Sequence, residues 1–488
     1  MVVVVGGGAT GLGVAWDLVQ QGVPVTVVEQ GDLGQGTSGR FHGLLHSGAR
    51  YAVEDPGTAR DCWTENQILR RIAPGAVEAT GGYFVATAGD AEEYEERWLL
   101  GCQTAGIPVR PVPVAEARQR VPALGGGVRR VYGVPDGVLE GFSLLLGLAK
   151  GIVAQGGAVW PRTRLTRVAS RAGSVSGVEL DGAGGRRTLA CSAVVNAAGP
   201  WAGEVSTRFE DPIALRLASG TMLVFAHRQV PLVINRLAPP GDGDILVPHR
   251  HVSIFGTTDV PVAHAGALGA TVSEVQRLME LGGELYPGIE QWRVLRAFAG
   301  IRPLFDGGIS AEGWVSREFA VIDHGRRGGM AGAFSVVGGK WTTYRKMAQE
   351  TANAVMGYLG IRRTADTATL RVPLDPGPGS ADSDATPLIC ECERVSAAAL
   401  ARQNGSLSER RVATWFGMGP CQGTFCGDRA AQSRARVVGV EAAEQELAAF
   451  RAERAKGMVA VRWGRNAQQE ALQQAIRWQT LGEREERP

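Results

Sequence analysis

Lysine is scarce in this sequence of 488 residues. The 51 basic residues are arginines apart from four lysines, which are Lys150, Lys340, Lys346 and Lys456. A lysine in such a chain is a candidate for a role that needs a compact point charge rather than a planar guanidinium. Two of the four, Lys340 and Lys346, lie within seven residues of the Gly338-Gly339 pair. We therefore expect both to face a ligand there.

The sequence also lacks a surplus of one charge sign, a set of paired cysteines and a long apolar run. The 51 basic and 49 acidic residues leave a formal charge of +2, which gives no sign of a nucleic-acid partner. Seven cysteines are too few, and odd in number, for a secreted disulfide scaffold. No apolar stretch approaches the roughly 18 residues of a membrane span, and no signal-peptide pattern opens the chain. We expect a cytoplasmic protein of a reducing compartment, with no transmembrane segment.

Glycine is abundant instead, at 68 of 488 residues, about twice its usual share. Apolar residues make up 44% and charged residues 20%, as in ordinary folded proteins, which excludes a disordered or collagen-like chain. The length predicts two to four domains. Residues 372–387 are rich in Pro, Gly, Ser and Asp, as linkers are, and the tail from about residue 440 has a helical composition.

The first 29 residues predict a strand–helix–strand unit. Four valines at 2–5 form a buried strand, an apolar-periodic helix covers about 11–21, and residues 24–28 form a second, parallel strand. Further strands are expected at 82–85, 193–195, 222–225, 252–255 and 334–337, and helices near 58–72, 91–105, 142–155, 272–285 and 341–359.

The turn of this unit, Gly6-Gly-Gly8-Ala-Thr-Gly11, fits the pattern of a dinucleotide-binding loop. Its glycines allow a tight turn, the approach of a pyrophosphate and close packing of the helix, whose amides face the phosphates. Glu29 ends the second strand, where a carboxylate can accept hydrogen bonds from an adenosine ribose. Strand, loop, helix and acid together predict dinucleotide binding, with nicotinamide and flavin both open.

Three other segments are candidates for cofactor contact. Residues 194–201 form a strand that runs into small residues, although an ordinary strand-to-helix turn explains them as well. Residues 335–346 combine a strand, a glycine pair and a helix start, whose dipole favours the electron-rich edge of a reduced flavin. Residues 38–51 hold two histidines, two arginines and several glycines, which favours an active-site loop over a plain surface loop.

Together these segments resemble the FAD-dependent glycerol-3-phosphate dehydrogenases, and among them the large catalytic subunit of the anaerobic, membrane-associated enzyme. The matching pieces occur in order along the chain: 6–11, 40–53, 134–137, 196–201, 244–248, 256–259, 300–304, 316–317 and 338–345. Two departures are Phe41, where relatives carry Asn, and Ser219-Gly220 in place of a Lys-Gly pair.

The resemblance implies an α/β fold. It has a Rossmann-like FAD-binding domain of the D-amino-acid-oxidase type, a mixed-sheet substrate domain and a small helical C-terminal iron–sulfur domain. The oxidoreductase part would span 1–371 and be followed by the linker at 372–387 and the C-terminal domain at 388–488. Within it, the FAD domain is discontinuous, at about 1–80, 140–210 and 296–360, and the substrate domain covers about 81–139 and 211–295.

The implied reaction oxidises sn-glycerol 3-phosphate to dihydroxyacetone phosphate, with the C2 hydrogen leaving to flavin N5. A basic pocket for the phosphate would be lined by Arg50, Tyr51, Thr258, Arg302, Arg317 and Lys340. A phosphate monoester carries nearly two negative charges and calls for several fixed cations. His46 is a candidate for the base, although it could equally contact only the flavin. Expected FAD contacts are Gly6, Gly8, Ala9, Thr10, Gly11, Glu29, Gln30, Ser38, Arg40, His42, Gly43, His46, Ser47, Ala198, Gly199, Trp201, Gly338, Gly339, Lys340, Trp341 and Thr342.

Four of the seven cysteines, Cys390, Cys392, Cys421 and Cys426, fall within 37 positions. Paired thiolates from two loops can hold one metal centre, and C-x-C with C-x₄-C fits zinc poorly. The segments resemble a bacterioferritin-associated-ferredoxin-like [2Fe–2S] domain, with zinc or a metal-free remnant as alternatives. The cluster suits electron transfer through partner subunits to a membrane quinone, with the chain peripheral on the inner face. Cys62, Cys102 and Cys191 fit helical or strand patterns and are expected to be buried.

Two other functions remain open on the sequence alone. One is an FAD dehydrogenase of the same fold that acts on a 2-hydroxy acid or an amine. The other is a non-catalytic electron-transfer protein, which needs the cysteines but not the basic pocket.

Overall fold

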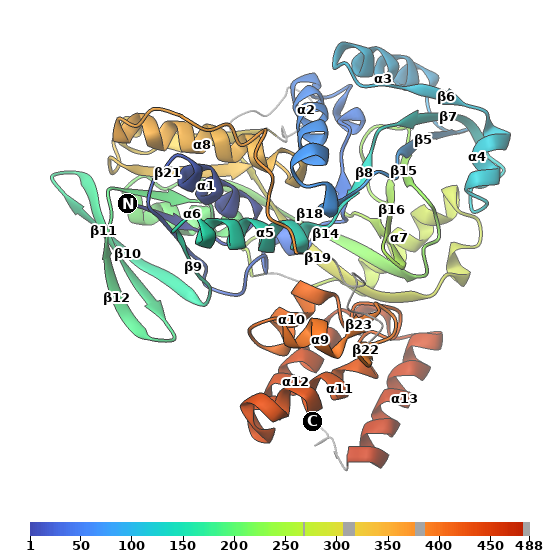
Figure 1. Ribbon diagram of the computed structural model, residues 1–488. Helices are drawn as coiled ribbons and strands as arrows, with labels where there is room; N and C mark the ends of the chain where they lie inside the picture. Colours follow the sequence, from blue (N-terminus) through green and yellow to red (C-terminus); the bar gives the residue numbers. More distant parts are fainter. Residues whose placement is uncertain (267–268, 306–317, 376–385, 482–488) are drawn as a thin grey trace.

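The computed structural model describes residues 1–266, 269–305, 318–375 and 386–481. Two large sheets with their helices lie side by side, and a group of C-terminal helices lies below them (Figure 1). Among the described residues, no helix is long and apolar enough to cross a membrane.

The first large sheet has six strands. Five are parallel and the edge strand β20 is antiparallel to β21. Their order is β20 (Phe319–Asp323), β21 (Ala333–Gly338), β13 (Ala193–Asn196), β1 (Val2–Val5), β2 (Val25–Val28) and β9 (Ala158–Trp160). Parallel strands need both faces covered, which explains the continuous apolar runs that made them visible in the sequence.

Helices cover one face of this sheet, and a small antiparallel sheet covers the other. The helices are α1 (Ala9–Gln20), α5 (Gly141–Ala154) and α8 (Tyr344–Leu359), which share one apolar core with β1 and β13. The small sheet consists of β10 (Thr163–Arg171), β11 (Ser174–Gly182) and β12 (Gly185–Ala190). Its apolar side chains pack with Val3, Val28 and Val194 from the opposite face.

The second large sheet is mixed. β15 pairs with β5 in parallel and the other pairings are antiparallel. Its order is β18 (Val260–Val262), β14 (Leu215–Ala226), β17 (Val252–Gly256), β16 (Ile245–His249), β15 (Val233–Arg236), β5 (Gly82–Thr87), β7 (Val128–Val134) and β6 (Arg110–Val112), with β19 (Val294–Phe305) also on β14.

Helices α3 (Glu92–Thr104), α4 (Val114–Arg120) and α7 (Val272–Leu285) belong to this lobe. Between the two large sheets lie α2 (Pro56–Ile72) and a short sheet of β3 (Leu44–Leu45), β8 (Gly137–Leu139) and β4 (Val77–Glu78). The connection from β13 carries the short helix α6 (Ala202–Ser206).

The C-terminal region is helical around a two-stranded ribbon. It contains β22 (Leu388–Cys390), β23 (Val395–Ser396), α9 (Ala397–Ala401), α10 (Leu407–Thr414), α11 (Cys426–Val438), α12 (Val440–Lys456) and α13 (Gly464–Leu481). Ala460 and Val461 are buried in the core of the second large sheet. The ring of Trp415 packs against His249, with ring centres 5.0 Å apart, and against Phe142 at 6.1 Å. The region is therefore docked on both lobes.

The structure confirms the predicted fold class and the strands and helices expected from the sequence patterns. The helix predicted at 11–21 begins two residues earlier, at Ala9, because the glycine turn ends at Gly8, before the apolar pattern starts. Most of the predicted linker, residues 376–385, lies outside the described residues. The domain boundaries remain a prediction.

One buried ion pair ties α2 to α8. Arg345 Nε donates to Glu65 at 2.8 Å, and the two side chains are 8% and 2% exposed. A charge in such a place is tolerated only with its partner, because burial without a counter-charge costs several kcal/mol.

We expect Glu65→Ala to lower the free energy of unfolding by about 3–5 kcal/mol, because Arg345 would stay buried without its carboxylate. Urea unfolding followed by tryptophan fluorescence measures it. Glu96→Ala, at an exposed position of α3, is the control and should change stability by less than about 0.5 kcal/mol. Equal stabilities of the two variants would contradict a stabilising role for the ion pair between Glu65 and Arg345.

Glu140, which precedes α5, is buried where the C-terminal region meets both lobes. Its Oε1 lies 3.1 Å from Nε2 of His249. Burial raises the pKa of Glu140 to about 7 and lowers the pKa of His249 to about 3. The folded protein thus favours a neutral Glu140 beside a neutral His249.

Because its folded pKa lies above the ordinary 4.5, Glu140 stabilises the fold fully only at low pH. That contribution is lost as the pH rises from about 4.5 to about 7. We expect Glu140→Gln to be more stable than the parent protein at pH 8, by about 1–3 kcal/mol, and equal to it near pH 4.5. Thermal midpoints at the two pH values measure this, with Glu96→Gln as the control. A stability difference that stays the same at both pH values would contradict the raised pKa of Glu140.

Candidate active site

The turn between β1 and α1 is built by close approach of backbone atoms. Gly6 has a φ of +117°, and a Cβ there would lie 2.4 Å from the carbonyl oxygen of Ala197. A Cβ on Gly11 would lie 1.9 Å from the carbonyl oxygen of Gly6. Only glycine fits these two positions without moving the chain. Helix α1 then starts at Ala9 with no side-chain hydrogen bond from its N-cap residue, Gly8.

Two side chains complete this turn. The hydroxyl of Ser38 accepts a hydrogen bond from the Ala9 amide at 3.0 Å. The carboxylate of Glu29 accepts hydrogen bonds from the amides of Gly7, at 2.7 Å, and Gly31, at 2.8 Å. Glu29 is thus held at the end of β2, as its place in the sequence predicts.

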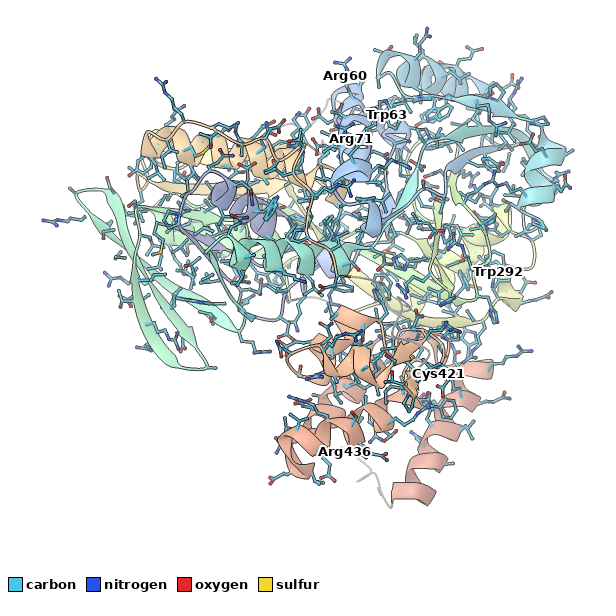
Figure 2. The ribbon with its side chains drawn as sticks, in the orientation of Figure 1. Arg60, Trp63, Arg71, Trp292, Cys421 and Arg436 are labelled. Atoms are coloured by element: carbon cyan, nitrogen blue, oxygen red, sulfur yellow. The ribbon has the colours of Figure 1, made fainter. Side chains whose placement is uncertain are left out.

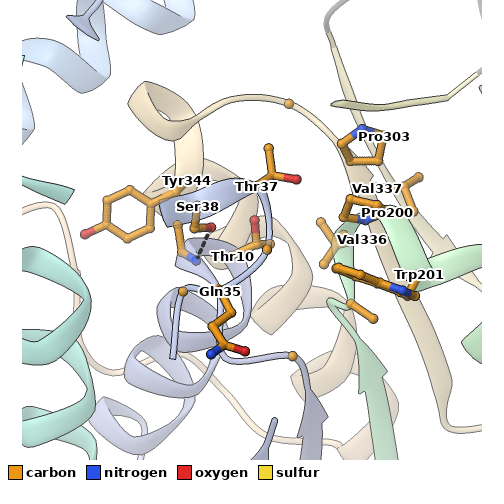
Figure 3. A pocket seen from close by; sticks show the side chains of 18 of the residues that line it. Thr10, Gln35, Thr37, Ser38, Pro200, Trp201, Pro303, Val336, Val337 and Tyr344 are labelled. Atoms are coloured by element: carbon orange, nitrogen blue, oxygen red, sulfur yellow. Dashed lines mark hydrogen bonds between the residues drawn. The ribbon is translucent and has the colours of Figure 1, made fainter. Parts of the chain in front are cut away.

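A cavity of about 450 Å³ begins at this turn and runs along the ends of the parallel strands. Figure 3 shows Thr10 and Ser38 on one side of it and Pro200 and Trp201 on the other. The predicted cofactor residues that line it are Gly6, Gly8, Ala9, Thr10, Glu29, Gln30, Ser38, Arg40, His42, His46, Ala198, Gly199, Trp201, Gly338, Gly339, Lys340 and Trp341. The structure therefore brings together four segments that are far apart in the sequence.

Four predicted cofactor residues stand behind this lining. Gly11 packs against the turn itself, and Gly43 lies against the ring of His249, where a Cβ would come within 2.7 Å. Ser47 is fully buried and its amide donates to Asp136 at 2.7 Å. The hydroxyl of Thr342 accepts from the His46 amide at 3.1 Å. These residues shape the wall and do not face the cavity.

A second cavity of about 200 Å³ opens from the first, between the two large sheets. The two share Thr37, Arg40, Phe41, His42, His46, Tyr51 and Arg302 in their linings. The second lobe contributes Gly220, Met222, Pro240, Gly241, Asp242, Ile245, Thr257, Asp259 and Gly300. A small molecule in this cavity would lie against one end of a molecule in the larger one.

Arginines from two distant segments of the chain, at residues 50 and 302, reach the second cavity. Arg50 is held by Asp244, with 2.9 Å between NH2 and Oδ2. Arg302 is held by Asp259 at 2.7 Å and donates to the carbonyl of Thr258 at 2.8 Å and to the hydroxyl of Thr257. The Arg50 and Arg302 side chains are 13% and 18% exposed, so both guanidiniums are fixed and partly desolvated.

Other predicted pocket residues take different places. The ammonium of Lys340 lies 4.4 Å from the centre of the Tyr51 ring. The side chain of Thr258 is buried, donates to Glu274 at 2.8 Å and does not line the cavity. Arg317 lies outside the described residues.

His46 lines both cavities although it is only 7% exposed. Its ring lies 5.7 Å from the ring of His42 and 5.3 Å from that of Tyr51, measured between centres. The side-chain amide of Asn66, on α2, donates to the His46 carbonyl at 3.0 Å. The histidine is therefore held by α2 on one side and by Thr342 on the other.

The expectation that Lys346 faces a ligand is wrong. Its ammonium lies 2.5 Å from Asp61 and 3.8 Å from Glu350, and it lines neither cavity. Lys346 lies in the first turn of α8, seven residues after the glycine pair, and the helix points it towards Asp61 on α2. The buried positions of Cys62, Cys102 and Cys191, by contrast, are confirmed.

Sequence reasoning missed several lining residues. Thr257 and Asp259 line the cavity on either side of the predicted Thr258, and Gly220 and Gly300 come from neighbouring strands. The alternation of side chains along an extended segment could have revealed Thr257 and Asp259, because successive side chains point to opposite faces. Phe41 also lines both cavities, 5.3 Å from the Trp341 ring.

The four C-terminal cysteines lie close together as free thiols. A hydrogen bond from Cys426 lowers the pKa of Cys421 to about 5 and that of Cys390 to about 7, while burial raises the pKa of Cys392 to about 11. In the described part of the chain, no three His, Cys, Asp or Glu side chains are arranged as metal ligands. The thiols instead form hydrogen bonds with one another. Their number and chemistry still suit an iron–sulfur centre, for which the thiolate is the ligand.

Comparison with known proteins gives the family. The FAD dependent oxidoreductase family matches residues 1–345. The chain belongs to this family. The matched residues end before the four C-terminal cysteines, so the family assignment does not extend to the expected [2Fe–2S] domain.

Several relatives match nearly the whole chain. The A1 subunit of the anaerobic glycerol-3-phosphate dehydrogenase of Haloferax volcanii is 35% identical over 538 residues, which cover 99% of this chain and 91% of the relative. The A subunit of the anaerobic glycerol-3-phosphate dehydrogenase of Escherichia coli K12 is 35% identical over 505 residues, 95% of this chain and 93% of the relative. A crystal structure of glycerol-3-phosphate dehydrogenase from Bacillus halodurans, complexed with FAD, superposes with a TM-score of 0.58 at 21% identity. The superposition covers 98% of this chain and 88% of the Bacillus halodurans chain, and it shows that the two share a fold.

The larger cavity suits the cofactor of this family. Its glycine turn has no room for a Cβ, the first amides of α1 face it, and a carboxylate stands at the end of β2. These are the features that a pyrophosphate and an adenosine ribose require. The short helix at 341–343 leads into α8, and amides at such a start favour the negative charge of a reduced flavin.

We expect Glu29→Ala to weaken FAD binding about 10- to 100-fold, because the variant cannot accept hydrogen bonds from the ribose hydroxyls. Titration of the deflavinated protein with FAD, followed by flavin fluorescence, measures the Kd. Asp32→Ala, three residues further on and paired with Arg162, is the control. Unchanged affinity of the Glu29 variant would exclude this contact.

Proposed function

We propose that the protein oxidises sn-glycerol 3-phosphate to dihydroxyacetone phosphate, with FAD as the first electron acceptor. The observation that carries this proposal is the cavity of about 200 Å³, which joins the larger one and is lined by two fixed arginines, Arg50 and Arg302. Its volume suits a three-carbon phosphate ester. The names of the Haloferax volcanii and Escherichia coli relatives support the same substrate.

The charge of the cavity matches a phosphate. Arg50 and Arg302 are oriented by acidic partners before any ligand arrives, so little side-chain entropy is lost on binding. Their guanidiniums can donate pairs of hydrogen bonds to phosphate oxygens. Lys340 over the Tyr51 ring would supply a third cation, nearer to the flavin. We propose the same role for Arg317.

The chemistry needs a group that takes the proton of the C2 hydroxyl. His46 reaches both cavities, and we propose that a ring nitrogen of His46 holds this proton. Hydrogen bonds to Thr342 and from Asn66 fix the main chain of His46, and its ring packs against the rings of His42 and Tyr51. When bound, FAD supplies a two-electron acceptor. The residues around it bind and orient the alcohol and exclude water.

We further propose that electrons leave through the C-terminal region. Cys390, Cys392, Cys421 and Cys426 would hold a [2Fe–2S] centre, which accepts electrons one at a time. Partner proteins would carry these electrons to a quinone, since both relatives are named as one component of an enzyme with several subunits. The chain would then lie on the cytoplasmic face of a membrane. The unit boundaries that we propose are 1–371, 372–387 and 388–488.

Steady-state assays with glycerol 3-phosphate, glycerol and 2-hydroxyglutarate, with a dye as electron acceptor, test the substrate. We expect turnover with the first and a kcat/KM lower by orders of magnitude with glycerol, which lacks the phosphate. A protein that oxidises 2-hydroxyglutarate but not glycerol 3-phosphate would overturn the proposal. An absence of flavin absorbance after reconstitution would do the same.

We expect Arg302→Gln to lower kcat/KM for glycerol 3-phosphate about 10- to 100-fold, the cost of one charge-assisted contact to phosphate. The rate with glycerol should change far less, because the lost partner is the phosphate. Arg326→Gln, at a position 88% exposed, is the control. Equal losses with both substrates would assign Arg302 a structural role instead.

A further inference from the structure

Four arginines converge between the flavin cavity and the cysteine cluster. Arg40 lines both cavities, Arg296 lies on β19, Arg411 on α10 and Arg454 on α12. Two of these elements belong to the C-terminal region. We call the four residues the arginine bridge.

Hydrogen bonds connect the bridge to the cysteine loop. Arg296 and Arg454 both donate to the side-chain oxygen of Gln422, the residue that follows Cys421. Arg411 and Arg454 also donate to the sulfur of Met418, at 3.1 and 3.6 Å. A neutral amide and a thioether are weak partners for guanidiniums.

The bridge carries more positive charge than the protein around it compensates. Glu453 acts on all four arginines and Asp32 acts on Arg411 alone, and an oxygen of Glu453 already accepts from Lys456 at 2.8 Å. The Nε atoms of Arg411 and Arg454 are buried without a hydrogen-bond partner in the described structure. Burial lowers the pKa of Arg296 to about 10, which leaves it charged at neutral pH. Burial also lowers the pKa of Arg454, and a negative charge at Cys426 acts in the opposite direction.

A surplus of buried cations needs a negative charge nearby. Neither of the two cavities reaches past Arg40 into the bridge. The negative charge that adjoins the bridge is that of the cysteine sulfurs. A four-thiolate iron–sulfur centre is an anion and becomes more negative when it accepts an electron.

We propose that the arginine bridge draws electrons from the flavin cavity to the cysteine site by stabilising the reduced form of the centre held there. This inference rests on the proposed function. With both groups bound, each step would move one electron from reduced FAD to the oxidised centre, and the arginines would keep their protons. Two steps remove the two electrons of the alcohol, and a one-electron acceptor outside the chain takes them in turn. Arg454, beside Cys426, acts most strongly on the centre.

The test measures reduction potentials in the reconstituted holoprotein by spectroelectrochemistry. We expect Arg454→Gln to make the potential of the iron–sulfur centre more negative. The electron-transfer equilibrium should shift towards the flavin by about tenfold, the effect of one unit charge at close range in a partly screened site. Arg454→Lys keeps the charge and should restore most of the shift. A role in packing alone would not produce this charge dependence.

Arg436→Gln is the matched control. It removes the same charge from α11, and Figure 2 shows Arg436 on the far side of the C-terminal helices from Cys421 and the main body. We expect no change in potential. If Arg454→Gln does not fold, as its thermal midpoint would show, Arg296→Gln carries the same test from β19.

Three outcomes would overturn the inference. The potential of the centre could be the same in Arg454→Gln as in the parent protein, or Arg454→Lys could behave as Arg454→Gln does. The parent protein could also contain no iron or sulfide after reconstitution, which would remove the proposed cysteine route as well. Reduction of the flavin by glycerol 3-phosphate in Arg454→Gln is measured separately. If it persists while the potential does not move, the inference fails and the proposed function stands.

Discussion

Backbone packing at the first turn is the constraint on which the site depends. Gly6 and Gly11 bring β1, α1 and the chain after β13 into contact at distances that leave no room for a side chain. This contact sets where α1 begins, and so where its free amides point. It also brings Ala198 and Gly199 next to the same amides. The larger cavity exists because three backbone segments can approach one another this closely.

The second constraint is the placing of charge. The protein is nearly neutral as a whole, yet arginines collect at the smaller cavity and at the arginine bridge. At the cavity, Asp244 and Asp259 hold the guanidiniums in place. At the bridge the compensation is weaker, and the cysteine sulfurs lie beside the surplus. In the proposed function, substrate binding and electron exit both depend on positive charge that is local and partly buried.

Much of the fold could be predicted because its signals are local. The valines of β1, the glycine turn and the acid at Glu29 follow one another within 29 residues, and each rests on backbone geometry. The prediction for Lys346 failed because closeness to a glycine pair in sequence does not fix direction on a helix. Thr258 shows the same limit on an extended segment. Its side chain points away from the cavity while those of Thr257 and Asp259 line it, because a shift of one residue moves a side chain to the opposite face.

The sequence by itself determined the kind of chemistry: a dinucleotide loop, a histidine- and arginine-rich segment and four clustered cysteines. The resemblance to a known family then named a substrate. Only the tertiary structure decided which side chains face which cavity, because that depends on the rotation of each helix and the register of each strand. It also decided that the end of α12 lies against β19, which brings Arg296 and Arg454 to the same glutamine, Gln422, across more than 150 positions of chain. Such contacts between distant segments leave no pattern in a single sequence, because each arginine reads there as an ordinary surface charge.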